Sequence, residues 1–164
     1  MEIRIAESES DLRRCYPIMV QLRPHLAEGE FIERVARQMG RYGYAVVYVE
    51  DDGEVRAVAG YRISECLCDG RFLYVDDLVT DQSSRSRGYG EQLLAWLVAK
   101  GQEEGCAELG LESGVQRHDA HRFYLRARMR ISSYHFSLNL RDVRVNTRQD
   151  VASERRFEVI TRTM

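Results

Sequence analysis

Residues 85–90 read Arg-Ser-Arg-Gly-Tyr-Gly, a short segment rich in arginine and glycine. Because glycine lacks a Cβ atom, Gly88 and Gly90 let an anion approach the backbone closely, and successive N–H groups there can converge on it. A helix that begins near Gly90 adds the partial positive charge of its N-terminus. The segment predicts a diphosphate-binding loop, and an ordinary tight turn with a capped helix is the alternative.

This segment differs from two common phosphate-binding motifs. A Walker loop places a lysine directly after its last glycine, whereas Glu91 follows Gly90 in this chain. A dinucleotide-binding fingerprint needs a third glycine at position 93, which is Leu93 here. The loop is therefore expected to bind its anion in a different sequence context.

Two adjacent acidic residues, Asp76 and Asp77, interrupt an otherwise apolar run over residues 72–80. Burial of ionised carboxylates is costly, so we expect these side chains to face a cleft or water. Successive residues of a strand point to opposite faces, which predicts that only one of the two reaches a substrate. A carboxylate there can accept the proton of an amine, which arrives mostly as ammonium. Glu112 and a chain of water molecules are the alternative bases.

The spacing of apolar residues predicts the elements that position these groups. Strands are expected at residues 3–5, 44–50, 55–67, 72–80, 107–112 and 131–140. Helices are expected from an N-cap at Ser8, Ser10 or Asp11 to residue 22, through residues 32–39 with Gly40 as the stop, from near Gly90 to Gly101, and over residues 117–130. This order predicts a mixed α/β fold, with a central, mostly antiparallel twisted sheet of six to seven strands and about four flanking helices.

Composition sets the class of protein. The 164 residues suffice for one domain with a core, and 44% hydrophobic and 30% charged residues are typical of globular proteins. The net charge of −2 argues against a nucleic-acid partner, although the Arg-rich residues 141–164 keep that alternative open. No apolar run approaches the roughly 20 residues of a membrane span. The first residues show no targeting pattern, so we expect a cytoplasmic protein without a membrane partner.

The four cysteines are not spaced like metal ligands. None of them forms the C-x-x-C pattern that is common at metal and redox sites. We therefore predict no metal site and interpret all four as reduced thiols of the core, which are Cys15, Cys66, Cys68 and Cys106.

On two motifs the chain resembles the GCN5-related N-acetyltransferase (GNAT) family. The family hallmark R/Q-x-x-G-x-G/A at the start of a helix is matched by Arg85-x-x-Gly88-x-Gly90. The sequence Ala-His-Arg-Phe-Tyr at residues 120–124 is similar to the family's A-x-x-F/L-Y segment, on a helix that follows the fifth strand. The order of elements agrees over roughly residues 3–140, so both motifs fall on the expected elements.

The resemblance implies that acetyl-CoA is the acetyl donor. Its pantetheine arm would pair with the backbone of Leu78, Val79 and Thr80. Its pyrophosphate would be held by the loop and first helical turn, formed by Arg85, Ser86, Arg87, Gly88, Tyr89, Gly90 and Glu91. Tyr124 matches the family tyrosine that protonates the departing thiolate. Asp76 matches the position of the family's acidic or histidine residue on this strand, and Asp77 is the neighbouring candidate.

The resemblance further implies an N-acetyltransferase that transfers the acetyl group directly to a primary amine of a small molecule or peptide. No cysteine intermediate is expected, because neither motif contains a cysteine. The alternative is a non-catalytic module that binds or senses acyl-CoA. The acetyltransferase domain is predicted over residues 1–143, and residues 144–164 as a tail that is either flexible or an edge strand able to pair with a second subunit in a homodimer.

Two positions depart from the family pattern. Arg117 stands where many members have an asparagine that contacts the cofactor, and Arg128 stands where the family usually has glycine at the helix end. Arg128 is therefore expected either to adopt a left-handed conformation or to let the helix continue to Arg130.

Overall fold

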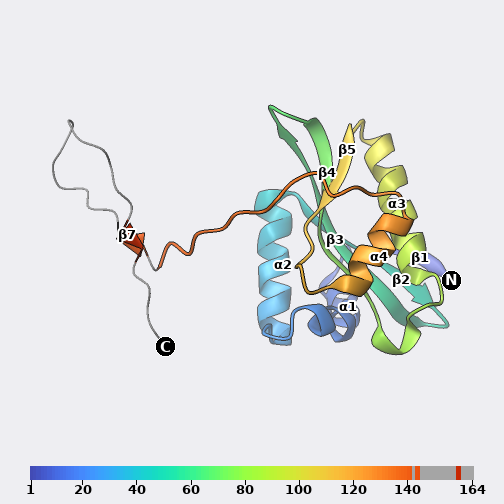
Figure 1. The fold of residues 1–164 in the computed structure, drawn as a ribbon. Helices are drawn as coiled ribbons and strands as arrows, with labels where there is room; N and C mark the ends of the chain where they lie inside the picture. The colour runs from blue at the N-terminus through green and yellow to red at the C-terminus, as the bar shows by residue number, and fades with distance from the viewer. Residues whose placement is uncertain (142, 145–157, 160–164) are drawn as a thin grey trace, which may run out of the picture. The chain divides into compact units, whose positions relative to one another are not determined.

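The structure, a computed structural model, describes residues 1–141, 143–144 and 158–159, which fall into two compact units, Met1–Met129 and Arg130–Met164. The first unit carries all of the predicted site residues. Its elements in chain order (Figure 1) are β1 (Glu2–Ile5), α1 (Glu9–Leu22), α2 (Glu28–Tyr42), β2 (Tyr44–Asp51), β3 (Glu54–Cys66), β4 (Gly70–Thr80), the 3-10 helix η1 (Gln82–Ser84), α3 (Tyr89–Glu103), β5 (Glu108–Leu111) and α4 (His118–Arg126).

The sheet of the first unit has five strands in the order β1-β2-β3-β4-β5. All neighbouring strands are antiparallel except β4 and β5, which are parallel and are connected through α3. The predicted mixed α/β fold is therefore confirmed. The predicted strand count of six to seven was too high, because the described residues place five strands in this sheet.

The second unit contains one short strand pair. The strands β6 (Val143–Arg144) and β7 (Glu158–Val159) are antiparallel neighbours. Most of the tail predicted at residues 144–164 lies outside the described residues, and so do residues 157 and 160 of the predicted edge strand. The domain boundary at residue 143 stays a prediction.

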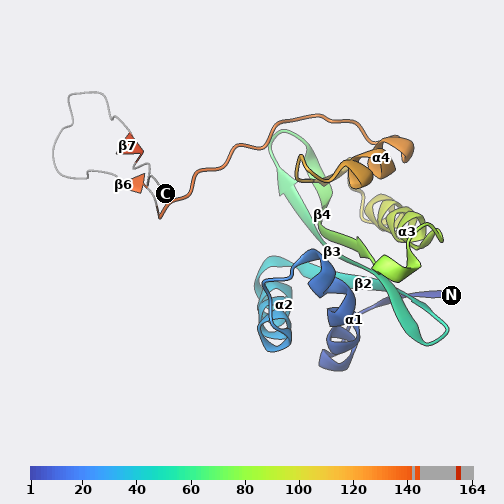
Figure 2. The ribbon, with the colours of Figure 1, turned by 60° about the horizontal axis from the view of Figure 1, so that its bottom comes forward.

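The sheet separates two groups of helices. Figure 2 shows α1 and α2 on one face of the sheet and α3 with α4 on the other. One core cluster joins α1 and α2 to residues such as Val46, Tyr48 and Val58, and a second joins α3 to residues such as Val47 and Leu73. Neighbouring strand residues thus pack on opposite faces. None of the helices in the described part of the chain has the length and apolarity that a bilayer crossing requires.

The helix ends on the first face follow from local chemistry. Asp11 N donates to Ser8 Oγ at 3.1 Å and Ser8 N donates to Asp11 Oδ2 at 3.0 Å, a capping box that confirms Ser8 as the N-cap of α1. The stop predicted at Gly40 was wrong, because α2 continues to Tyr42. It ends at Gly43, whose φ of 64° is the left-handed conformation that glycine adopts at low cost.

The strand predicted at residues 131–140 is not formed. These residues have no regular structure, and several of their large apolar side chains are exposed, which are Ile131, Tyr134, Phe136, Leu138 and Leu140. Alternating apolar residues favour a strand only where a neighbouring strand supplies hydrogen bonds and a packed face. The strand pair that the described residues of this unit form, β6 with β7, does not include the segment.

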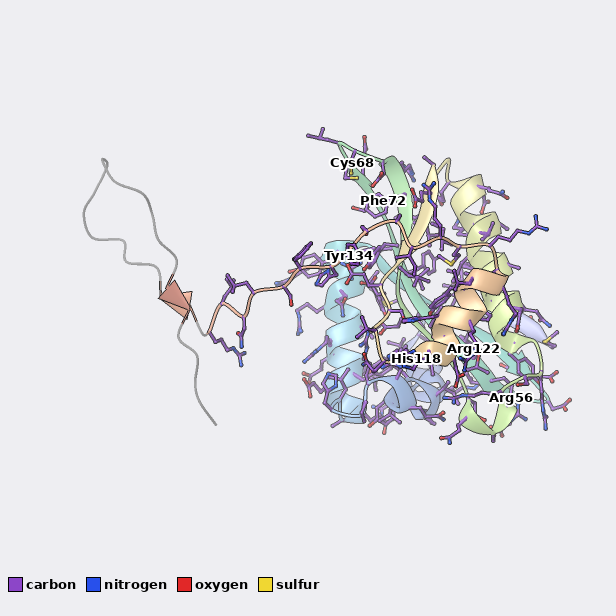
Figure 3. All side chains as sticks on the ribbon, viewed as in Figure 1. Arg56, Cys68, Phe72, His118, Arg122 and Tyr134 are labelled. Carbon is purple, nitrogen blue, oxygen red and sulfur yellow. The ribbon has the colours of Figure 1, made fainter. Side chains whose placement is uncertain are left out.

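The cysteines are free, as predicted, but they do not all belong to the core. Cys15 is buried, whereas Cys66 is half-buried and Cys68 is exposed. Figure 3 shows Cys68 at the end of the β3–β4 hairpin, beyond the packed part of the sheet. The hairpin tip holds the sulfur atoms of Cys66 and Cys68 at 3.3 Å from each other. The core interpretation was therefore wrong for Cys68.

The helix α4 ends at Arg126, four residues earlier than predicted, because Arg128 adopts the left-handed conformation with a φ of 64°. Met129 N donates to Tyr124 O, and Arg128 N donates to Leu125 O, both at 3.0 Å. These two bonds form a Schellman motif, which satisfies the last carbonyl groups of the helix. Its left-handed position, usually a glycine, is occupied here by an arginine.

We expect the substitution Arg128→Gly to stabilise the protein. A left-handed non-glycine residue costs roughly 1–2 kcal/mol, and the greater backbone freedom of unfolded glycine returns about half of that. The midpoint of thermal unfolding should therefore rise by about 1–3 °C. Arg126→Gly is the matched control and should lower the midpoint, because residue 126 is helical. A lower midpoint for Arg128→Gly would contradict this assignment of strain.

Candidate active site

A bulge in β4 places two carboxylates on one side of the sheet. In the pairing with β3, Gly60 faces Asp77 but Tyr61 faces Val75, so Asp76 is an extra residue without a partner. An extra residue interrupts the alternation of side chains. Asp76 and Asp77 consequently line the same pocket, on the side of α1 and α2. The expectation that the two side chains point to opposite faces of the sheet was wrong for this reason.

Asp77 is held by two donors from other elements. Arg23 Nε donates to Asp77 Oδ1 and the Tyr44 hydroxyl donates to Asp77 Oδ2, both at 2.7 Å. Burial, followed by the charge of Asp77, raises the pKa of Tyr44 well above its ordinary value, so this phenol keeps its proton. A Cβ atom at Gly60 would lie 1.7 Å from the Tyr44 hydroxyl oxygen. Only glycine at position 60 leaves room for the ring.

Asp76 is held by one arginine in a two-pronged ion pair. Arg62 Nε and Nη2 each donate to the Asp76 carboxylate at 2.8 Å. The same guanidinium lies over the Tyr44 ring, 5.8 Å from its centroid. Burial raises the pKa of Asp76 above its ordinary value, while the hydrogen bonds from Arg62 partly oppose that shift. A carboxylate with a raised pKa is a better proton acceptor than a solvated one.

The two carboxylates form one wall of a pocket of about 280 Å³. Its apolar part comes from Met19, Leu26, Phe31 and Val35, and its polar part from Arg23, His25, Arg34, Gln38, Tyr44, Asp76 and Asp77. These residues belong to α1, α2, the segment between them, β2 and β4. Convergent polar groups in an apolar hollow are typical of a small-molecule site.

Beyond the pocket, β4 has a free edge. The pairing of β4 with β5 covers Phe72–Val75, and within the described residues the rest of β4 pairs with β3 alone. The main-chain groups of residues 76–80 that face away from β3 therefore have no strand beside them. An extended ligand can add to such an edge as a further strand would. This is where the predicted contacts of Leu78, Val79 and Thr80 lie.

The chain then passes through η1 into the predicted anion loop. Ser86 has a φ of 62° and Gly88 a φ of 85°, and Gly88 is the N-cap of α3. No side chain caps this helix end, so the first backbone N–H groups of α3 remain available to a ligand. The positive φ of Gly88 explains why a glycine occupies this position. At Gly90 the reason is space, because a Cβ atom there would lie 3.1 Å from Thr80 Oγ1.

The side chains of the loop have different surroundings. Tyr89 is buried and its hydroxyl donates to Asp51 Oδ2 at 2.6 Å, so its ring anchors the loop to the β2–β3 turn. Arg85, Arg87 and Glu91 are exposed. The loop therefore offers backbone N–H groups at its base and two exposed guanidinium groups at its surface, a donor set that fits a diphosphate.

Tyr124 lies on α4, whose first turn carries His118, while Arg122 projects from its surface (Figure 3). Its side chain is partly buried, and burial raises the pKa of its phenol, opposed by the nearby charge of Arg117. The adjacent Phe123 ring would lie 3.8 Å from a Cβ atom at Gly90. The two sequence motifs thus meet at the start of α3, although Tyr124 is not part of the pocket lining.

The residues that hold the carboxylates were missed in the sequence. Arg23, Arg62 and Tyr44 come from three different elements, and no local pattern connects them to Asp76 or Asp77. Gly60 carried a usable signal, because a glycine inside a strand often marks a bulge or a close approach. Glu112, the alternative base, lies just after β5 and contributes, after burial, to raising the pKa of Tyr74 to about 12.

Comparison with known proteins gives consistent matches. The sequence profile of the Acetyltransferase (GNAT) family matches residues 6–128. The chain is 32% identical over 117 residues to the uncharacterized N-acetyltransferase YhdJ of Bacillus subtilis (strain 168), covering 71% of this chain and 82% of that protein. It is 35% identical over 63 residues to the aminoalkylphosphonate N-acetyltransferase of Salmonella typhimurium, covering 38% of this chain and 41% of the relative.

A solved structure resembles the fold as well. It is the aminoglycoside N-acetyltransferase AAC(6')-Iy in complex with CoA, which superposes with a TM-score of 0.76 at 17% identity. The superposition covers 85% of this chain and 94% of that chain.

We expect Gly60→Ala to disrupt the pocket wall. The added methyl group overlaps the Tyr44 ring, so the ring must move and its hydrogen bond to Asp77 must break. Overpacking of this kind costs about 1–3 kcal/mol, and the broken bond adds to it, which a urea titration measures. Gly40→Ala is the matched control, because a Cβ atom at this position of α2 would meet nothing within 4 Å outside its own stretch of helix backbone, and the change should be neutral or stabilising. Equal stability of the two variants would contradict the steric argument.

Proposed function

Because the chain belongs to the Acetyltransferase (GNAT) family and is an acetyl-CoA-dependent acetyltransferase, we propose that it acetylates a primary amine of a small molecule or peptide. The observation that carries the proposal is the bulge at Asp76, which presents two carboxylates to a pocket beside the free edge of β4. The acceptor would enter the pocket from the side of α1 and α2. The donor would lie along the edge.

The residues present fit the donor. Acetyl-CoA, when bound, supplies an activated acetyl group as a thioester. The backbone of Leu78, Val79 and Thr80 would hold its extended arm, since no strand of the described residues lies beside this edge of β4. The uncapped N-terminus of α3 and the loop from Arg85 to Gly88 would hold its pyrophosphate. Gly90 keeps the start of α3 against the end of β4, so both contacts can be made together.

Asp76 is the proposed proton acceptor for the amine. Its raised pKa and its position on the pocket wall support this role, and Arg62 fixes the orientation of its carboxylate. Asp77 is bound by Arg23 and Tyr44, which makes it the better candidate for positioning the amine. The pocket lining contains no cysteine, which favours direct attack by the amine over an acyl-cysteine intermediate.

Tyr124 is the proposed proton donor to the departing sulfur. Burial raises the pKa of its phenol, so the hydroxyl is protonated at neutral pH and can act as a general acid. Its neighbour Phe123 lies near Gly90 at the start of α3, which supports a role for Tyr124 beside the proposed donor site. The matched Salmonella protein is named for an aminoalkylphosphonate acceptor, which supports an amine as the acceptor here.

Thiol release tests the proposal directly. The protein is incubated with acetyl-CoA and a panel of primary amines, and free thiol is followed over time. We expect release that depends on at least one amine. Tyr124→Phe should lower kcat by about 10²-fold or more while the Kd for CoA, measured by calorimetry, stays unchanged. A protein that binds CoA but releases no thiol with any amine would be the non-catalytic sensing module, and the proposal would be wrong.

The pH dependence of kcat/KM tests the role of Asp76. A general base acts in its ionised form, so activity should rise with pH as Asp76 loses its proton. Because its pKa is raised, this rise should lie above pH 3.8, the ordinary value. Asp76→Asn should remove the rise and lower kcat by about 10²–10⁴-fold. Asp77→Asn removes the same charge from the same wall and should keep the rise, and loss of it in this control would assign the base to Asp77.

A further inference from the structure

The acceptor pocket contains one arginine that is paired with neither of its two carboxylates. Arg23 is bound to Asp77 and Arg62 to Asp76, so each acid already has its own guanidinium group. Arg34, on α2, also lines the pocket. Among the described residues its ion-pair partner is Glu30, one helical turn earlier on α2, which is 49% exposed and is not part of the lining.

The pair of Arg34 with Glu30 is easily exchanged. Exposed ion pairs four residues apart on a helix contribute only about 0.3–0.5 kcal/mol. Arg34 lines the pocket and its side chain is 41% exposed, so a ligand anion in the pocket competes with Glu30 for the same guanidinium group. The guanidinium can therefore turn to a bound anion at little cost.

Two other polar groups line the pocket with Arg34. Gln38 follows it by four residues, so both lie on the same face of α2. Arg62 donates to Gln38 Oε1 at 3.3 Å, which leaves the two N–H groups of the Gln38 amide for a ligand. His25 adds an imidazole from the segment between α1 and α2. Guanidinium, amide and imidazole donors together suit a carboxylate, phosphonate or phosphate.

We propose that the acceptor is a small amine that also carries an anionic group, with the amine at Asp76 and Asp77 and the anion bound by Arg34, Gln38 and His25. This inference rests on the proposed function and specifies its substrate class. The volume of about 280 Å³ fits a short molecule of this kind. The apolar lining, which includes Phe31 and Val35, would contact the carbon chain between the two charged ends.

The same charge balance disfavours a polyamine. The first ammonium group would take up Asp76 and Asp77, the two carboxylates of the lining, so a second ammonium group would lie near Arg34 with no lining carboxylate beside it. An acceptor with an uncharged far end would leave Arg34 paired with Glu30 and would gain no binding free energy from the arginine. The order of preference is therefore anionic, then uncharged, then cationic.

A matched series of acceptors tests the inference on the unmodified protein. The series has one chain length and varies only the far end, as an amino carboxylate, an aminoalkylphosphonate, an amino alcohol and a diamine. Thiol release from acetyl-CoA gives kcat/KM for each. We expect the better anionic acceptor to exceed the amino alcohol at least tenfold and the diamine by more. The ratio of carboxylate to phosphonate then identifies the anion.

The variant Arg34→Gln locates the anion site. It should raise KM for the anionic acceptor about 10- to 100-fold, change kcat little, and leave KM for the amino alcohol nearly unchanged. Arg37→Gln is the control, since Arg37 is an exposed residue of α2 outside the lining, and it should behave as the unmodified protein. Melting temperatures check that both variants are folded.

The possible failures are distinguishable. Thiol release with the amino alcohol or the diamine but no preference for an anionic acceptor would overturn this inference and leave the proposed function intact. An equal rise in KM for all acceptors in Arg34→Gln would also overturn it, because the arginine would then act on the pocket as a whole. No release with any amine, despite binding of CoA, would overturn the proposed function itself.

Discussion

The unpaired residue at Asp76 is the constraint on which the rest of the site depends. In a regular strand Asp76 and Asp77 would point to opposite faces, and one of them would enter the core that α3 covers. The bulge turns both toward α1 and α2, while Leu78 returns to the α3 side and Val79 to the other. It also lies directly after the last pair of β4 with β5. The acidic wall of the pocket and the free edge of β4 therefore both begin at Asp76.

Two carboxylates side by side repel each other, and the surrounding residues offset that repulsion. Arg23 and Arg62 supply opposite charges, and the Tyr44 hydroxyl adds a neutral donor. Partly buried ion pairs of this kind add little net stability, because desolvation cancels most of the attraction. Their value is positional. They fix the direction of two acidic groups in a pocket whose lining also includes Arg34 of α2.

The sequence allowed most elements of the first unit and the glycine positions of the loop before α3 to be predicted, because their signals are local. Ser8 as a cap and the glycines of the loop each act within a few residues. The bulge depends on the register between β3 and β4, which only the assembled sheet determines. The strand expected at residues 131–140 failed for a related reason, since its apolar alternation specifies a strand but not a neighbour to pair with. The roles of the site residues, Tyr124 and Asp76 above all, stay predictions.

The contact between Tyr44 and the backbone at Gly60 couples two positions on adjacent strands. The ring occupies the volume that any side chain at position 60 would need, so neither residue can change in size alone. Among descendants of a common ancestor, the two positions should therefore covary: a bulkier residue at 60 should accompany a smaller one at 44. Such a chain would hold the acid at position 77 without a phenol beside it, and a shift in acceptor preference could arise there through paired substitutions.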